Sequence, residues 1–238
     1  MLGVMSLVKI WLSSQFDMKD LGEVNYILGI KLWRDRKNRM LGLSQAGYID
    51  KILARFSMQN SKKGLLPFRH GVPLSDDQIP KTLEEEKITR QVPYALAVGS
   101  FMYAMLCTRP DICYLVDIVS RYQSNLGPKH WEVVKYILKY PRRMRDYMLV
   151  YHCEDLILIG YTDSDFQSNL DFRKSTSGCV FTLGGGAISW RSVKQSCIGD
   201  STMDAKYVAV CEAAEEAVWF KKFLFDLGVM RMEQVPII

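Results

Sequence analysis

The spacing of apolar residues changes several times along this chain, and these changes limit the folds that it can adopt. Apolar side chains at helical spacing predict a first helix over about residues 3–16. From Val24 to Trp33 the spacing becomes that of a strand, and Asp35-Arg-Lys-Asn38 is typical of a turn before a return strand from Met40 to Ser44. The first part of the chain is therefore predicted to hold a helix and a β-hairpin with a basic tip.

Helical spacing returns after this hairpin and dominates the middle of the chain. A helix is predicted after Ser44, which can cap it, and residues 57–93 are predicted to form a long irregular connection because they contain four prolines and a charged run. Three further helices are predicted after this connection, over about residues 94–107, 111–123 and 129–140.

The last third of the chain changes to strand spacing and then to one long helix. Four strands are predicted, at Met148–Tyr151, Leu156–Thr162, Gly178–Leu183 and Ala187–Trp190. A helix from about Thr202 to Leu227 follows them, and Gln234–Ile238 is typical of the start of another strand. The predicted fold class is α+β. A helical and hairpin part at residues 1–146 precedes a mixed β-sheet with a long helix at residues 147–238.

Composition and charge exclude several classes of protein. The 31 Lys and Arg against 26 Asp and Glu give a net charge of +5, which permits a nucleic-acid partner without requiring one. The six cysteines form no CxxC pair, which argues against a zinc site, and they suit an intracellular protein with reduced thiols. Residues 1–8 lack the features of a signal peptide, and the apolar stretch Tyr94–Cys107 is too short to span a bilayer. We therefore predict an intracellular protein, cytoplasmic or nuclear, with no membrane partner.

Ordered short motifs along nearly the whole chain resemble the Pol polyprotein of copia-type retrotransposons. The motifs include Phe16-Asp-Met-Lys-Asp-Leu-Gly22, Val98-Gly-Ser-Phe-Met-Tyr-Ala104, Thr108-Arg-Pro-Asp-Ile112, Gly160-Tyr-Thr-Asp-Ser-Asp165 and Lys174-Ser-Thr-Ser-Gly178. The resemblance implies the region after the polymerase active site. It would comprise thumb or connection elements of the reverse transcriptase and then a ribonuclease H domain that is incomplete at its C-terminus.

On this resemblance, the hairpin at residues 24–45 would correspond to the primer grip of the reverse transcriptase. Its basic tip carries Arg34, Arg36, Lys37 and Arg39, which suit contacts to nucleic-acid phosphates. The alternative is an ordinary solvated hairpin tip. No Tyr-x-Asp-Asp motif occurs in the sequence, so this chain is expected to have no polymerase activity.

The resemblance also implies a site for metal-dependent cleavage of the RNA strand of an RNA–DNA hybrid. Two-metal hydrolysis needs converging carboxylates, and Mg²⁺ prefers such oxygen ligands. Asp163, at the end of the strand Leu156–Thr162, matches the family's first catalytic Asp, although Asp is also common in turns. Asp165 is the weaker candidate and fits better as a turn residue.

Asp204 matches the catalytic Glu of the family, but the surrounding stretch departs from the family's pattern. Where the family has Ser-Thr-x-Glu-Ala-Glu-Tyr, this chain has an Asp at position 204 and a Lys at position 206. Asp204 is shorter than Glu by one methylene, and Lys206 places a positive charge beside a site meant for cations. Alternatively, Ser201 and Asp204 form a capping box at the start of the long helix.

Two further departures weaken the prediction of activity. The third catalytic Asp of the family would lie beyond Ile238, and Pro141 stands where the family continues a helix, so that it is expected to break the last helical turn. The leading hypothesis is a Pol fragment of the ribonuclease H class that is inactive alone, with Mg²⁺ as the family's cofactor and the rest of the polyprotein as a partner. The alternatives are a non-enzymatic remnant that binds RNA–DNA hybrids or other nucleic acid, and an interaction module that reuses the fold.

Overall fold

The computed structural model describes residues 2–66, 74–152, 156–229 and 235–238. The described elements, in chain order, are α1 (Leu2–Gln15), β1 (Tyr26–Ile27), β2 (Ile30–Asp35), β3 (Met40–Ser44), α2 (Ala46–Arg55), η1 (Asp76–Gln78), α3 (Leu83–Arg90), α4 (Tyr94–Cys107), η2 (Pro110–Ile112), α5 (Cys113–Ser120), α6 (Pro128–Arg143), β4 (Leu149–His152), β5 (Leu158–Asp165), β6 (Thr176–Leu183), β7 (Gly186–Lys194) and α7 (Thr202–Asp226). This arrangement is mixed, with two antiparallel sheets and a long last helix, and it agrees with the predicted α+β class.

The first sheet has the strand order β1-β2-β3-β4, and its strands β2 and β3 form the return hairpin that was predicted. The single strand predicted from Val24 to Trp33 is wrong, because Leu28 and Gly29 have positive φ and turn the chain, so that Tyr26 of β1 pairs with Lys31 of β2. The hairpin turn is stabilised by Asp35, whose Oδ1 accepts a hydrogen bond from the Asn38 amide at 3.0 Å. The strand at 149–152 pairs with β3, with Leu41 opposite Tyr151. We expected this strand to join the later strands in one sheet, and that expectation is wrong. β4 instead forms its backbone hydrogen bonds with the edge of β3 that β2 leaves free.

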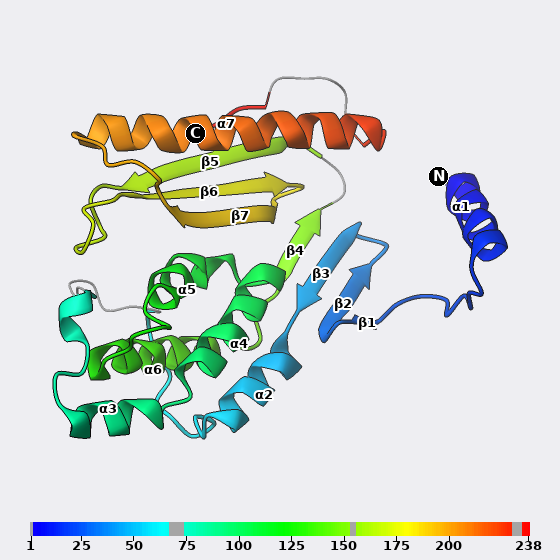
Figure 1. The fold of residues 1–238 in the computed structure, drawn as a ribbon. Helices are drawn as coiled ribbons and strands as arrows, with labels where there is room; N and C mark the ends of the chain where they lie inside the picture. Colours follow the sequence, from blue (N-terminus) through cyan, green and yellow to red (C-terminus); the bar gives the residue numbers. More distant parts are fainter. Residues whose placement is uncertain (1, 67–73, 153–155, 230–234) are drawn as a thin grey trace.

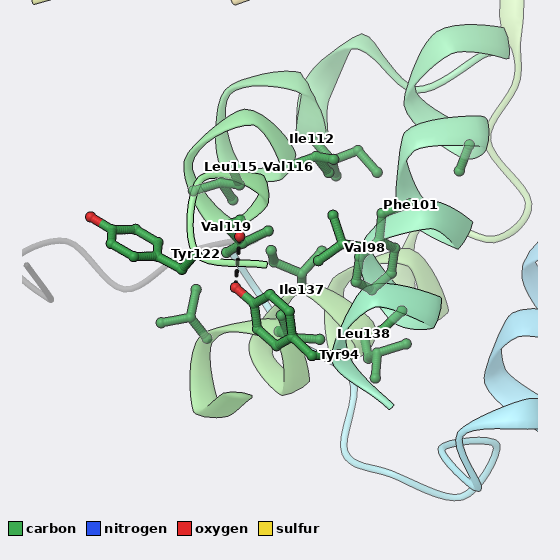
Figure 2. Packing of buried hydrophobic residues seen from close by; sticks show 14 of the residues in the cluster. Tyr94, Val98, Phe101, Ile112, Leu115, Val116, Val119, Tyr122, Ile137 and Leu138 are labelled. Carbon is green, nitrogen blue, oxygen red and sulfur yellow. Dashed lines mark hydrogen bonds between the residues drawn. The ribbon is translucent and has the colours of Figure 1, made fainter. Parts of the chain in front are cut away.

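A bundle of helices follows the first sheet and holds the larger hydrophobic core. The core is formed by α2, α4, α5 and α6, and Figure 2 shows its buried side chains pointing toward one another. Tyr94 is 1 % exposed, and its hydroxyl donates to the Val119 carbonyl at 2.7 Å. This bond satisfies a polar atom that would otherwise be buried without a partner.

The predicted irregular connection at residues 57–93 contains two short helical elements, so this prediction is wrong in part. The helix α3 begins at a capping box: the Glu85 amide donates to the Thr82 hydroxyl at 3.2 Å, and the Glu85 carboxylate accepts from the Thr82 amide at 3.3 Å. Pro67 and Pro73, which supported the prediction, lie outside the described residues.

The helix α6 continues to Arg143, so the expected break at Pro141 does not occur. Proline costs a helix the hydrogen bond to the carbonyl four residues earlier, here that of Ile137. Pro141 is buried in an apolar pocket that Ile49 and Leu53 also line. This packing offsets the loss at a position close to the helix end.

The second sheet has the order β5-β6-β7, and a last segment lies along its β5 edge. Two glycines with positive φ, Gly184 (+58°) and Gly185 (+76°), form the tight turn between β6 and β7. The Ile238 amide donates to the Gly160 carbonyl at 2.9 Å, and Gly160 and Ile237 form a parallel bridge. The predicted strand at the end of the chain therefore pairs with β5 at residues 235–238, while Gln234 lies outside the described residues.

The second sheet lies between α7 and the helical bundle (Figure 1). On the α7 side, a second core joins Leu158 and Phe181 to Ala217, Phe220 and Leu224 of the helix. On the bundle side, the Trp190 indole N–H donates to the Met105 carbonyl of α4 at 2.8 Å. One face of this sheet therefore packs against α7, and the other face contacts the helical bundle.

Candidate functional site

Alternation along β5 decides which way its candidate residues point. The Thr162 hydroxyl donates to the Ala209 carbonyl of α7 at 3.2 Å, so the Thr162 side chain faces that helix. Successive side chains of a strand point to opposite faces. Asp163, and with it Asp165, therefore points to the face that is turned toward the helical bundle.

A cavity of about 540 Å³ lies on this face of the sheet, and Asp163 and Asp165 line it. Its walls also include Tyr161 of β5, Trp190 of β7 and Tyr114 of α5. The Tyr114 hydroxyl donates to Asp165 Oδ2 at 2.6 Å, which joins the helical bundle to the sheet. Burial, and then the hydrogen bond and charge of Asp165, raise the pKa of Tyr114, so the phenol stays protonated.

Asp163 itself has a local backbone partner. Its Oδ1 accepts from the Ser164 amide at 2.8 Å, and the residue is exposed. Nearby in the cavity wall, burial and then the charge of Asp117 raise the pKa of Cys113 to about 11, so its thiol is a poor nucleophile at neutral pH. The cavity therefore offers carboxylates and aromatic rings, but no activated thiol.

Asp204 lies on the other side of the second sheet, in the first turn of α7. The Ser201 hydroxyl accepts from the Asp204 amide at 3.1 Å and donates to Asp204 Oδ2 at 2.8 Å. The first bond is the N-cap that the alternative interpretation of this residue predicted. The second differs from a full capping box, because the Asp204 carboxylate accepts from the Ser201 hydroxyl and not from the Ser201 amide. Lys206 follows within the same turn and is exposed.

The structure places the two predicted metal ligands on different elements, β5 and α7. Asp163 lines the cavity on the bundle side of the sheet, whereas Asp204 lies in the first turn of α7 and is bonded to Ser201. Nowhere in the described part of the chain do three or more His, Cys, Asp or Glu side chains gather closely enough to hold a metal ion. The assignment of Asp163 and Asp204 as metal ligands rests on the resemblance and stays a prediction.

The four basic residues of the hairpin tip are all exposed, but they differ in their partners. Arg34 donates to the Val24 carbonyl at 2.6 Å, and Arg36 forms an ion pair with Glu23. Lys37 and Arg39 form no ion pair with any residue that the structure describes. The structure therefore leaves these two cations available for a partner, whereas Arg36 is already neutralised.

The sequence did not point to the bundle side of this cavity. Tyr114 and Trp190 are separated by most of α5, α6 and three strands, and no spacing rule joins them. Only the docking of α5 against the second sheet brings them to one cavity. Among the described residues, no helix has both the length and the apolar character needed to cross a membrane.

Comparison with known proteins places the chain among transposon proteins. It is 47 % identical over 233 residues to the retrovirus-related Pol polyprotein from transposon TNT 1-94 of Nicotiana tabacum, a match that covers 98 % of this chain and 18 % of that polyprotein. It is 32 % identical over 228 residues to the Pol polyprotein from transposon RE1 of Arabidopsis thaliana, covering 95 % of this chain and 15 % of that protein. The chain thus spans less than a fifth of either polyprotein.

A third relative is much shorter. The secreted RxLR effector protein 161 of Plasmopara viticola is 40 % identical over 131 residues, which is 55 % of this chain and 92 % of the effector. No known family model matches the chain, and neither does any solved structure. The matches to the transposon polyproteins show that the chain belongs to the family of retrovirus-related Pol polyproteins of copia-type transposons.

Proposed function

We propose that this chain is a ribonuclease H-like, nucleic-acid-binding part of a copia-type Pol polyprotein, and that it binds RNA–DNA hybrids without cutting them. The ribonuclease H part of this proposal is supported by strand order. The strands β7, β6 and β5 and the segment 235–238 lie side by side, the last of them parallel to β5, and α7 follows β7 in sequence. This is the order of strands, hairpin and helix that the resemblance implies.

The lack of cleavage is supported by one observation above the others. Asp163 points away from α7, while Asp204 of α7 is engaged in a helix cap with Ser201. Hydrolysis by two metal ions needs carboxylates that converge on one point. Mg²⁺ is the cofactor that the resemblance implies, but the donors in the described residues do not supply such a centre.

Hybrid binding is supported by the exposed cations of the hairpin tip, chiefly Lys37 and Arg39. A protein that neutralises phosphates releases counterions, so its affinity falls as salt rises. An intracellular location and contact with the rest of the polyprotein are also part of this proposal.

The test measures binding and cleavage of one labelled RNA–DNA hybrid by the full chain. We expect salt-dependent binding, no Mg²⁺-dependent cleavage, and no effect of Asp163→Asn on either readout. Cleavage by the unmodified chain that Asp163→Asn abolishes would overturn the proposal and establish Asp163 as a catalytic residue. The pair Asp204→Glu and Lys206→Glu is a further control, and in this chain it should restore no cleavage.

A second candidate function is an interaction module without nucleic-acid binding. It is favoured by the likeness to the Plasmopara viticola effector, which this chain covers over 92 % of the effector's length. The same binding assay separates the two candidates, because an interaction module of this kind would show no salt-dependent affinity for the hybrid.

A further inference from the structure

The helix α6 carries an unusual excess of positive charge on its outer face. One side of this helix is buried in the helical core by Val133, Val134, Ile137 and Leu138. The remaining positions carry five basic residues against one acidic residue, Glu132. The basic residues are Lys129, Lys135, Lys139, Arg142 and Arg143. With helical spacing, Lys135, Lys139, Arg142 and Arg143 fall on one outward face. The exposed Glu132 lies on the same face, so the cations exceed the acidic residues there by four to one.

These cations lack an ionic partner in the part of the chain that the structure describes. Within the described residues, Lys129, Lys135, Lys139, Arg142 and Arg143 form no ion pair. The Lys135 ammonium lies 5.7 Å from the ring centre of Trp131, and that of Lys139 lies 5.0 Å from the ring centre of Tyr136. These rings orient the amines along the helix surface but leave their charge uncompensated.

A second segment adds to this charge. The Gly64 amide donates to the Lys139 carbonyl at 3.0 Å, and a Cβ on Gly64 would lie 3.1 Å from the Lys139 Cβ. The chain near Gly64 therefore lies directly against α6. Lys62 and Lys63, both exposed, precede Gly64 by two residues and one residue and bring two more cations to the neighbourhood of Lys139.

We propose that this α6 basic face, defined as Lys62, Lys63, Lys135, Lys139, Arg142 and Arg143, binds the phosphate backbone of a nucleic-acid duplex. The inference rests on the proposed function, since it takes nucleic acid as the partner, but it assigns the contact to elements other than the hairpin tip. Lys135 to Arg143 spans about 12 Å of helix axis. Each strand of a duplex carries one phosphate per ~3.4 Å of the duplex axis, so a row of cations along that axis faces about three of them.

The surroundings of this face favour nucleic acid over a lipid surface. Helices that bind membranes in the interface place large apolar side chains in the lipid beside their cations. In α6 the large apolar side chains are turned into the core, and no strongly exposed apolar residue occurs between positions 128 and 143. The α6 part of this face thus offers charge without an apolar anchor, which suits a phosphate backbone. The exposed Leu65 and Leu66 follow Gly64 in the segment of Lys62 and Lys63 and are the residues that a lipid surface would contact, so the test below includes vesicles.

The experiment compares three charge-matched triple variants of the full chain. The test variant is Lys135→Gln, Lys139→Gln and Arg143→Gln. The hairpin variant is Arg36→Gln, Lys37→Gln and Arg39→Gln, and the control removes three cations elsewhere by Lys87→Gln, Lys221→Gln and Lys222→Gln. Affinity for a labelled RNA–DNA hybrid is measured by fluorescence polarisation without divalent ions, from about 50 to about 200 mM salt. Thermal unfolding of each variant checks that the fold is retained.

We expect the test variant to reduce the slope of log affinity against log salt by about 0.9 for each lost phosphate contact, hence by nearly three. The control should change it little. If the unmodified chain binds the hybrid and the test variant behaves like the control, the inference is wrong while the proposed function stands. If the unmodified chain binds no hybrid at low salt, the proposed function fails. Binding to anionic vesicles that the test variant loses, with no binding to the hybrid, would replace nucleic acid by a membrane as the partner.

Discussion

The contact between Gly160 and Phe181 in the second core allows a test in which two substitutions should compensate each other. Phe181 is 0 % exposed, and its ring packs against Phe220 with 5.3 Å between ring centres. A Cβ on Gly160 would lie 2.8 Å from Phe181 Cε1 and 3.3 Å from Cδ1, which is closer than van der Waals contact allows. Because the ring is enclosed, it cannot move aside cheaply.

The expected magnitudes follow from these contacts. Phe181→Ala removes a buried ring and should lower the free energy of unfolding by about 3–5 kcal/mol. Gly160→Ala overfills the core and should lower it by about 1–3 kcal/mol. In the double variant the new methyl group occupies part of the space that the ring leaves, so Gly160→Ala should cost little or become stabilising.

The assay is urea unfolding of the four proteins, followed by circular dichroism and by tryptophan fluorescence, since Trp219 packs against Phe220. The double-mutant cycle should give a favourable coupling of about 1–3 kcal/mol between the two substitutions. Phe225→Ala, at a residue of α7 that is 46 % exposed, serves as a control and should cost little in either background. Additive effects, within about 0.5 kcal/mol, would refute the predicted packing of Gly160 beneath Phe181.

Three further predictions concern charge and chemistry. His130 is fully buried, its Nδ1 accepts from the Gly127 amide at 2.8 Å, and burial lowers its pKa, so the folded state keeps it neutral. The free energy of unfolding should therefore fall as the pH drops below about 6.5, by at most ~1.4 kcal/mol per pH unit from this group. In denaturant titrations His130→Gln should flatten that pH dependence. Asp111→Ala leaves the guanidinium of Arg109, which is 5 % exposed, without its two-point partner and should lower the free energy of unfolding by about 1.5–3 kcal/mol. Asp146→Ala, at a carboxylate that is 80 % exposed, should lower it by less than about 1 kcal/mol. Equal losses in urea unfolding would contradict the stabilising role of the Arg109–Asp111 pair. Purified chain should extend no primer on any template, and metal-dependent nucleotide incorporation would show that polymerase chemistry is present after all.

Most helices and strands were predictable from turn residues and from the spacing of apolar residues within each segment. The hairpin at residues 30–44 and the long helix after Ser201 were predictable because turn residues and apolar spacing act within a few positions of each other. The capping box at Thr82 and Glu85 is equally local, so the start of α3 was also predictable from the sequence. The resemblance to copia-type Pol proteins is likewise a property of the sequence alone, and the relatives confirm it.

The pairing of elements was decided only in three dimensions. A strand of four residues such as β4 has unpaired groups on both edges, and nothing in its own residues distinguishes β3 from the later strands as its partner. The same holds for Asp163, whose neighbourhood depends on which face of β5 meets α7 and which meets α5. The sequence by itself determined most of the elements, their order and the family, because these follow from local chemistry. The tertiary structure alone decided which side chains share a face, because that depends on contacts between residues far apart in the chain.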